Sequence, residues 1–106
     1  MAQFDVHRNV GARRDTIPFV IVVQSSLFDK YVRRVVVPLI RLSAFGIVHQ
    51  PRVNPTFEIE NLAVVLNPLE IVSVSSAQLG EFVVSLASEG TCVVDALDEI
   101  FTQSWR

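Results

Sequence analysis

The chain has 106 residues, of which 50% are hydrophobic and 19% are charged. This length holds one hydrophobic core, so we expect a single domain over residues 1–106. A net charge of −2 excludes a protein that holds a nucleic-acid backbone by itself, because phosphate binding depends on Lys and Arg. The high apolar content of so small a domain predicts self-association into a homodimer.

The amino-acid inventory also excludes several other classes of protein. A single cysteine, Cys92, cannot form an internal disulfide or a Cys-based zinc cluster. The first residues lack the basic, apolar and small-residue order of a signal peptide. No apolar run approaches the roughly 20 residues that span a bilayer. We therefore expect a soluble cytoplasmic protein.

The first half of the chain predicts three strands. Gln3 to His7 alternates polar and apolar residues, as a half-buried strand does. Phe19 to Val23 is a β-branched run that favours a buried strand and forms a hairpin with the first. Val35 to Val37 is a third run, which Pro38 should end or place at a sheet edge, because proline donates no hydrogen bond.

The middle of the chain predicts a loop and then further strands. Gly46, Pro51 and Pro55 interrupt any period between Ser43 and Pro55, which indicates a loop. A second hairpin and a last strand follow; they comprise Phe57 to Glu60, a turn at Asn61, Leu62 to Leu66, and Ile71 to Val74.

The last third of the chain predicts two helices. A first helix should begin near Ala77 and end at Gly90, with an apolar stripe of Leu79, Phe82, Val83 and Leu86. A second helix should run from Thr91, a good N-cap, to Trp105. Its apolar stripe consists of Val93, Val94, Leu97, Ile100 and Phe101.

Residues that could carry chemistry are few. The two histidines, His7 and His49, have no ligand spacing, and no nucleotide or hydrolase motif is present. Cys92 lies in the first turn of the last helix, where the dipole can lower the pKa of a thiol, although a structural cysteine is the favoured interpretation. Trp105 either anchors an interface or folds back onto the sheet or dimer.

Six segments stand in a characteristic order: Gln3-Phe4-x-Val6, Phe19-Val20, Val23-Gln24-Ser25, Arg33-Arg34-Val35-Val36-Val37-Pro38-Leu39, Val72-Ser73-Val74 and Ala96-Leu97-Asp98. This order resembles the CcdB family, the toxins of plasmid and chromosomal toxin-antitoxin modules. The resemblance implies a mainly β fold with a C-terminal helix (α+β), namely an SH3-like barrel of antiparallel strands of the CcdB/MazF type, in a homodimer.

The resemblance also implies a function and partners. The protein would be a toxin and not an enzyme; it would need no cofactor or metal and would poison DNA gyrase, a type II topoisomerase, by binding its A subunit on cleaved DNA. A CcdA-like antitoxin would neutralise the toxin and, together with it, bind operator DNA as a repressor. The implied gyrase-binding residues are Ser25, Leu27, Phe28, Asp98, Phe101, Thr102, Gln103, Ser104, Trp105 and Arg106. We assign Arg8, Arg13 and Arg14 to the antitoxin, because guanidinium groups suit carboxylate recognition.

Two alternatives stay open at this point. Family members end in an aromatic-Gly-Ile tail just after a phenylalanine, whereas here Phe101 is followed by Thr102-Gln103-Ser104-Trp105-Arg106. One alternative is an endoribonuclease toxin on the same barrel, as in the related MazF and Kid group. Its cationic site would combine His7, as general acid or base, with Arg8, Arg13, Arg14, Arg33 and Arg34. The other alternative is an inactive relative that only binds antitoxin and regulates its operon.

Overall fold

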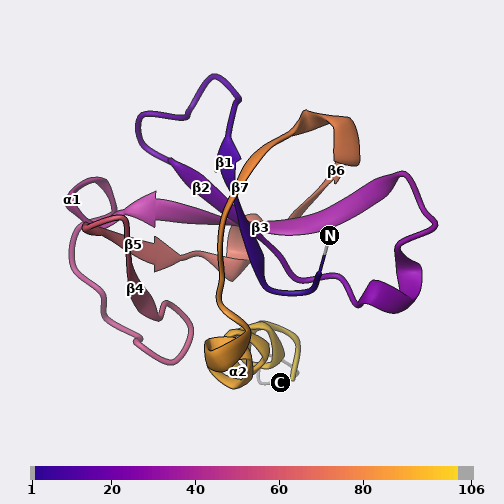
Figure 1. The fold of residues 1–106 in the computed structure, drawn as a ribbon. Helices are drawn as coiled ribbons and strands as arrows, with labels where there is room; N and C mark the ends of the chain where they lie inside the picture. Colours follow the sequence, from indigo (N-terminus) through magenta and orange to yellow (C-terminus); the bar gives the residue numbers. More distant parts are fainter. Residues whose placement is uncertain (1, 103–106) are drawn as a thin grey trace.

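The structure is a computed structural model that describes residues 2–102 (Figure 1). Its strands form one antiparallel sheet in the order β4-β5-β3-β2-β1-β7, with β6 paired to β3. The strands are β1 (Asp5–Asn9), β2 (Phe19–Val22), β3 (Arg33–Arg41), β4 (Thr56–Ile59), β5 (Leu62–Leu66), β6 (Val72–Ser75) and β7 (Leu79–Ser85). The helices are α1 (Leu42–Phe45) and α2 (Gly90–Thr102), and short 3-10 turns are η1 (Ser26–Phe28), η2 (Pro68–Glu70), η3 (Ser76–Gln78) and η4 (Ala87–Glu89).

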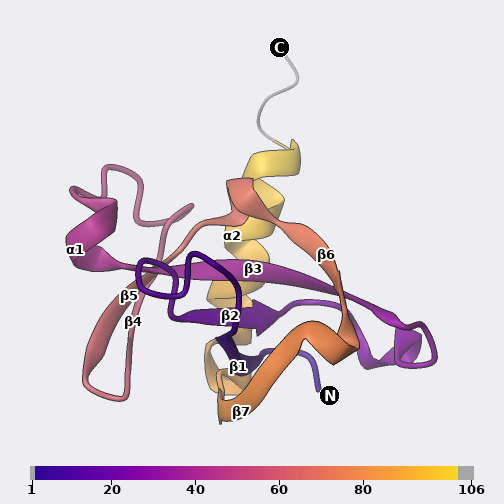
Figure 2. The same ribbon diagram turned by 90° about the horizontal axis from the view of Figure 1, so that it is seen from above.

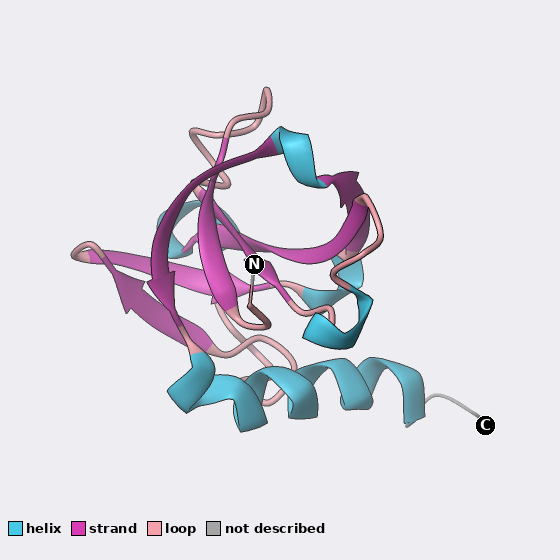
Figure 3. Cartoon of the chain, turned by 45° about the vertical axis from the view of Figure 1, so that its right-hand side comes forward, coloured by secondary structure: helices cyan, strands magenta, loops and turns pink. Residues whose placement is uncertain are grey.

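The two faces of the sheet have different neighbours. One face packs against α2, which runs along the sheet (Figure 3), and this core includes Phe19, Ile21 and Leu39 from the strands with Val93 and Ala96 from the helix. The opposite face curls into a half-barrel (Figure 3). The predicted mainly β fold with a C-terminal helix is confirmed.

Strand β3 is the spine of the sheet and is longer than predicted. It pairs with β2 on one side, and on the other side with β6 through residues 33–36 and with β5 through residues 39–41. The Pro38 carbonyl accepts a bond from Asn67 N at 3.2 Å. The N and C=O of one strand residue point to the same side. The missing N–H of Pro38 therefore faces the gap between β6, which pairs with residues 33–36, and β5, which pairs with residues 39–41. The prediction that Pro38 ends the strand or lies on an edge is therefore wrong.

The β4–β5 hairpin is confirmed, and its turn is tighter than expected. Glu60 and Asn61 both have positive φ, 53° and 63°. Positive φ at both central residues is the signature of the two-residue turn whose twist matches that of the flanking strands.

The helix predicted from Ala77 to Gly90 is wrong, because most of this segment is strand β7. Ser75 and Gln78 form a capping box around η3, and the chain then pairs with β1 from Asn9↔Leu79 to Asp5↔Ser85. As a strand, this segment forms backbone hydrogen bonds with the free edge of β1. The β-branched pair Val83-Val84 also favours a strand. Phe82, placed on the helical stripe, is 55% exposed.

Gly90 begins α2 and does not end a preceding helix. Its φ of −57° and ψ of −37° are helical, so the prediction that Gly90 ends a helix is wrong. A Cβ at this position would lie 2.7 Å from Cε2 of Phe4, which shows that glycine is needed here for close contact. Within residues 2–102, no helix is long and apolar enough to cross a membrane.

Candidate functional site

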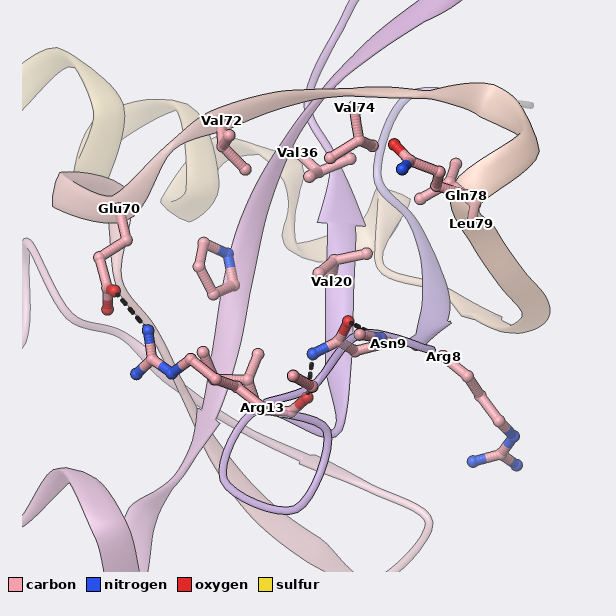
Figure 4. Close-up of a pocket in the computed structure, with 14 residues that line it drawn as sticks. Arg8, Asn9, Arg13, Val20, Val36, Glu70, Val72, Val74, Gln78 and Leu79 are labelled. Carbon is pink, nitrogen blue, oxygen red and sulfur yellow. Dashed lines mark hydrogen bonds and ion pairs between the residues drawn. The ribbon is translucent and has the colours of Figure 1, made fainter.

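A hollow of about 320 Å³ opens on the half-barrel face, between β6, β7 and the β1–β2 loop (Figure 4). We call it the barrel hollow. Its apolar wall comes mainly from β2, β3 and β6, and its polar rim from β1, the β1–β2 loop, η2 and η3. The lining residues include Val20, Val36, Val72, Val74 and Leu79 in the wall, and Arg8, Asn9, Arg13, Glu70 and Gln78 on the rim. The hollow is shaped for a small apolar group with polar flanks.

The rim of the barrel hollow is held by the side chains of Asn9, at the end of β1, and Arg13, in the β1–β2 loop. Arg13 Nη1 lies 3.2 Å from Glu70 Oε1, which ties this loop to η2. Asn9 Nδ2 donates to Ile17 O at 2.8 Å, and Asn9 Oδ1 accepts from Gly11 N at 3.0 Å. Arg13 remains 62% exposed in its side chain, so this cation stays available to an incoming carboxylate.

Arg8 lines the barrel hollow but directs its charge elsewhere. Its guanidinium points away from the valines (Figure 4) and contacts Glu60 Oε2 at 2.8 Å and Glu81 Oε1 at 2.7 Å. The hydrogen bonds to Glu60 and then Glu81 raise the pKa of Arg8 above its usual value. Arg14, the third residue assigned to the antitoxin, donates to Gly11 O at 3.2 Å in the same loop. Arg8, Arg13 and Arg14 thus come from β1 and the loop that follows it.

The predicted cationic cluster for RNA cleavage does not assemble. His7 is 6% exposed, and its Nδ1 donates to Gly80 O at 3.0 Å, since a carbonyl can only accept. Its Nε2 is buried without a partner among the described residues. Arg34 is 7% exposed and bonds loop carbonyls, while Arg33 donates to Ser73 Oγ and O. His7 therefore has no open face for a substrate, and the prediction of these six residues as one site is wrong.

The β2–β3 loop presents an apolar surface that contains three of the implied gyrase-binding residues. Ser25 caps η1, with its Oγ accepting from Leu27 N at 3.2 Å. Leu27 is 85% exposed and Phe28 is 50% exposed, and both face solvent. Sequence reasoning missed Tyr31 and Val32, which are 66% and 67% exposed in the same loop. The sequence signal that could have indicated this surface is the presence of four large apolar residues within a short turn-rich segment.

The other implied gyrase-binding residues lie at the end of α2. Phe101 is 65% exposed, Asp98 is exposed and Thr102 is the last residue of the helix. Gln103, Ser104, Trp105 and Arg106 lie outside the described residues. The β2–β3 loop and the end of α2 are far apart within one chain (Figure 2), so the structure does not bring the two sets together.

Cys92 is a packing residue at the start of α2. Burial, followed by the charges of Glu89 and Asp95, raises the pKa of its thiol. The sequence left open a pKa lowered by the helix dipole, whereas the structure raises the pKa of this thiol. Within residues 2–102, no group of three His, Cys, Asp or Glu side chains is placed to hold a metal ion.

Solved structures of toxins have the same fold. One is described as an endoribonuclease in complex with its cognate antitoxin from Mycobacterial species; it has a TM-score of 0.74 and 14% identity, covering 100% of this chain and 99% of that one. Another is the Mycobacterium tuberculosis toxin MazF-mt6, with a TM-score of 0.73 and 14% identity, covering 95% and 99%. The expectation that the chain is not an enzyme is contradicted by these neighbours, since an endoribonuclease is among them. No curated protein matches the sequence.

The family assignment comes from the sequence as a whole. The family model described as CcdB protein matches residues 3–103, which includes every strand and all of α2. The same-fold neighbours agree with it, because they too are toxins of this barrel type. The chain therefore belongs to the CcdB family and is a toxin of a toxin-antitoxin system.

Proposed function

We propose that this toxin acts in the cytoplasm by binding the A subunit of DNA gyrase and poisoning it. The match to the CcdB family over residues 3–103 carries the proposal. The exposed apolar side chains support it, because large apolar residues left in solvent mark interaction sites. The contact residues are those of the β2–β3 loop and the end of α2, including the tail through Arg106.

A homodimer is part of the proposal. The β2–β3 loop and the end of α2 lie far apart within one chain (Figure 2), so a second copy is the simplest way to present both regions to one target. In the proposed dimer, the ends of the two α2 helices lie side by side.

Growth and supercoiling assays test gyrase binding. The toxin should arrest a host with wild-type gyrase and spare a gyrase-resistant host, and the purified protein should inhibit supercoiling and accumulate cleaved DNA. Truncation after Phe101 should abolish both effects. If the truncated protein still arrests growth and still captures the A subunit, the assignment of the tail is wrong.

A pair of substitutions tests the β2–β3 loop separately from the tail. Leu27→Ser should weaken gyrase binding about tenfold, the effect of removing a contact worth about 1.4 kcal/mol. Ile47→Ser is the matched control, because Ile47 is also an exposed apolar residue, 76% accessible, outside the proposed contact. Equal affinities of the two variants would remove the loop from the site.

The antitoxin is proposed to be CcdA-like, to bind near Arg8, Arg13 and Arg14, and to repress the operon through its own contact with operator DNA. The barrel hollow supports an antitoxin contact, since an apolar side chain fits its wall and a flanking carboxylate can pair with Arg13. Arg13→Glu should allow growth arrest even when the antitoxin is co-expressed. Restored growth at the wild-type level would place the antitoxin elsewhere.

Endoribonuclease activity is the second candidate, favoured by the same-fold neighbour described as an endoribonuclease. The barrel hollow is one concave surface that could receive RNA, although His7 is closed off from it by burial. Incubating the purified protein with RNA in the absence of gyrase separates the two candidates, because only a nuclease yields discrete fragments. Lack of both activities would leave antitoxin binding and operon regulation as the function.

A further inference from the structure

Arg34 is a buried cation with an unusual set of acceptors. Its side chain leaves β3 on the half-barrel face and is 7% exposed. Nη2 donates to Asp29 O at 3.0 Å, and Nη1 donates to Tyr31 O and, at 3.0 Å, to Arg33 O. Two backbone carbonyls of the β2–β3 loop and one at the start of β3 therefore converge on one guanidinium.

This arrangement is poorly explained by stability alone. Arg34 forms no ion pair with any residue in the described range, and its Nε is buried without a partner there. Removing a cation from water is unfavourable, and neutral carbonyls offset this cost less well than a carboxylate does. An apolar side chain of similar volume is often as good for stability at such a position.

The carbonyls that Arg34 holds belong to the segment with the exposed apolar side chains. Asp29 directly follows Phe28 in the chain and Tyr31 comes two residues later, and the rings of Phe28 and Tyr31 lie 6.2 Å apart between centroids. Without Arg34, these carbonyls would have to turn toward solvent, and the side chains between them would move as well.

Gln24, which lies just after β2 at the start of the same loop, also restrains the loop. Its Nε2 donates to Phe28 O and Arg33 O, both at 3.2 Å, and its Oε1 accepts from Val35 N at 3.0 Å. The loop is thus held to the start of β3 by two side chains, those of Arg34 and Gln24. Ordering a binding loop before the partner arrives lowers the entropic cost of binding.

We propose that Arg34 is a positioning residue that holds residues 26–32 in the shape that presents Leu27, Phe28 and Tyr31 to the gyrase A subunit. The inference rests on the proposed gyrase contact. Arg34 touches no partner itself, and its effect is transmitted through the carbonyls of Asp29 and Tyr31.

The test compares Arg34→Met with Arg33→Met, because the Arg33 side chain donates to Ser73 in β6 and not to the loop. Amide exchange is followed in the loop, where Phe28 N, Asp29 N and Tyr31 N are hydrogen-bonded, and in the β1–β2 pair. Arg34→Met should speed exchange of the loop amides at least tenfold, leave the β1–β2 amides unchanged, and weaken binding to the purified gyrase A subunit about tenfold. Arg33→Met should change neither the loop amides nor the affinity.

Arg34→Lys is the second variant, which applies if Arg34→Met does not fold. An ammonium donates to fewer of the three carbonyls, so we expect partial protection of the loop and an affinity between those of wild type and Arg34→Met. Unchanged loop exchange in the folded Arg34 variants overturns the proposal, and so does an equal rise in the loop and the β1–β2 pair, which indicates a purely structural role. If the wild-type protein does not bind gyrase A, the proposed function has failed, whereas the exchange data still measure the hold of Arg34 on the loop.

Discussion

At the residue scale, the contact between Gly90 and Phe4 joins the turn just before β1 to the last helix. Phe4 adopts a left-handed φ of 72°, which is costly for an aromatic residue, and Leu86 N donates to Phe4 O at 2.9 Å. The Phe4 ring then lies against the position where Gly90 has no side chain. An unfavourable backbone conformation at one residue is thus retained because a close contact with a distant residue depends on it.

Replacing Gly90 tests this joint. Gly90→Ala should lower the free energy of unfolding by about 1–3 kcal/mol, the usual cost of overpacking, although alanine has the better helix propensity. In a Phe4→Leu background the added methyl meets a smaller side chain, so the additional cost of Gly90→Ala should fall. Urea unfolding of the four proteins measures this coupling, and strict additivity would contradict the steric explanation.

Cys92 supplies a test of pKa direction. Because burial raises the pKa of this thiol, the reactive thiolate is scarcer at neutral pH than in an unfolded chain. Iodoacetamide should therefore modify Cys92 more slowly in the native protein than in urea, and the native rate should keep rising at pH values above those where the unfolded rate levels off. A native rate faster than the unfolded one would restore the helix-dipole interpretation.

At the element scale, β7 is the strand whose placement depends most on a tight approach. A Cβ at Gly80 would lie 2.6 Å from Arg8 O and 2.9 Å from Val10 Cγ1. The Gly80 carbonyl also accepts from His7 Nδ1, next to the register shifts between β1 and β7. Glycine at this position lets β7 close onto β1.

Gly80→Ala should therefore push β7 from β1 and destabilise the fold by about 1–3 kcal/mol. Gly11→Ala is the control, since its nearest neighbour is the side-chain Oδ1 of Asn9 at 3.2 Å, which can move. Thermal unfolding gives the overall loss, and amide exchange should place it in β7 first. Equal effects of the two substitutions would show that the close approach to Arg8 O is not limiting.

The two hairpins and β7 show how far the sequence predicts this fold. Alternation in the first strand and the β-branched run of β2 are local signals, and both elements were predicted within a few residues. The apolar pattern of residues 79–86 fits a helix as well as a strand. The open edge of β1 decides in favour of a strand, and a local sequence pattern does not contain this information. The prediction of the functional site was limited in the same way, because the burial of His7 and Arg34 depends on how the sheet curls.

At the scale of the whole molecule, the exposed apolar side chains predict association. Leu27, Tyr31, Val32, Ile47 and Leu69 are each more than 60% exposed, which is a large apolar exposure for so small a chain. Sedimentation equilibrium should give about twice the 11.8 kDa chain mass at micromolar concentration. A single species at the chain mass would contradict the proposed homodimer.

The position of Val93 and Ala96 in the core has a consequence for the order in which the chain is synthesised. Both residues are fully buried against the sheet, and β1 obtains its second neighbour only when β7 has been made. The ribosome must therefore have released β7 and α2 before the core closes, and until then the apolar face of β2 and β3 has no cover. Chains that terminate before α2 should aggregate or be degraded.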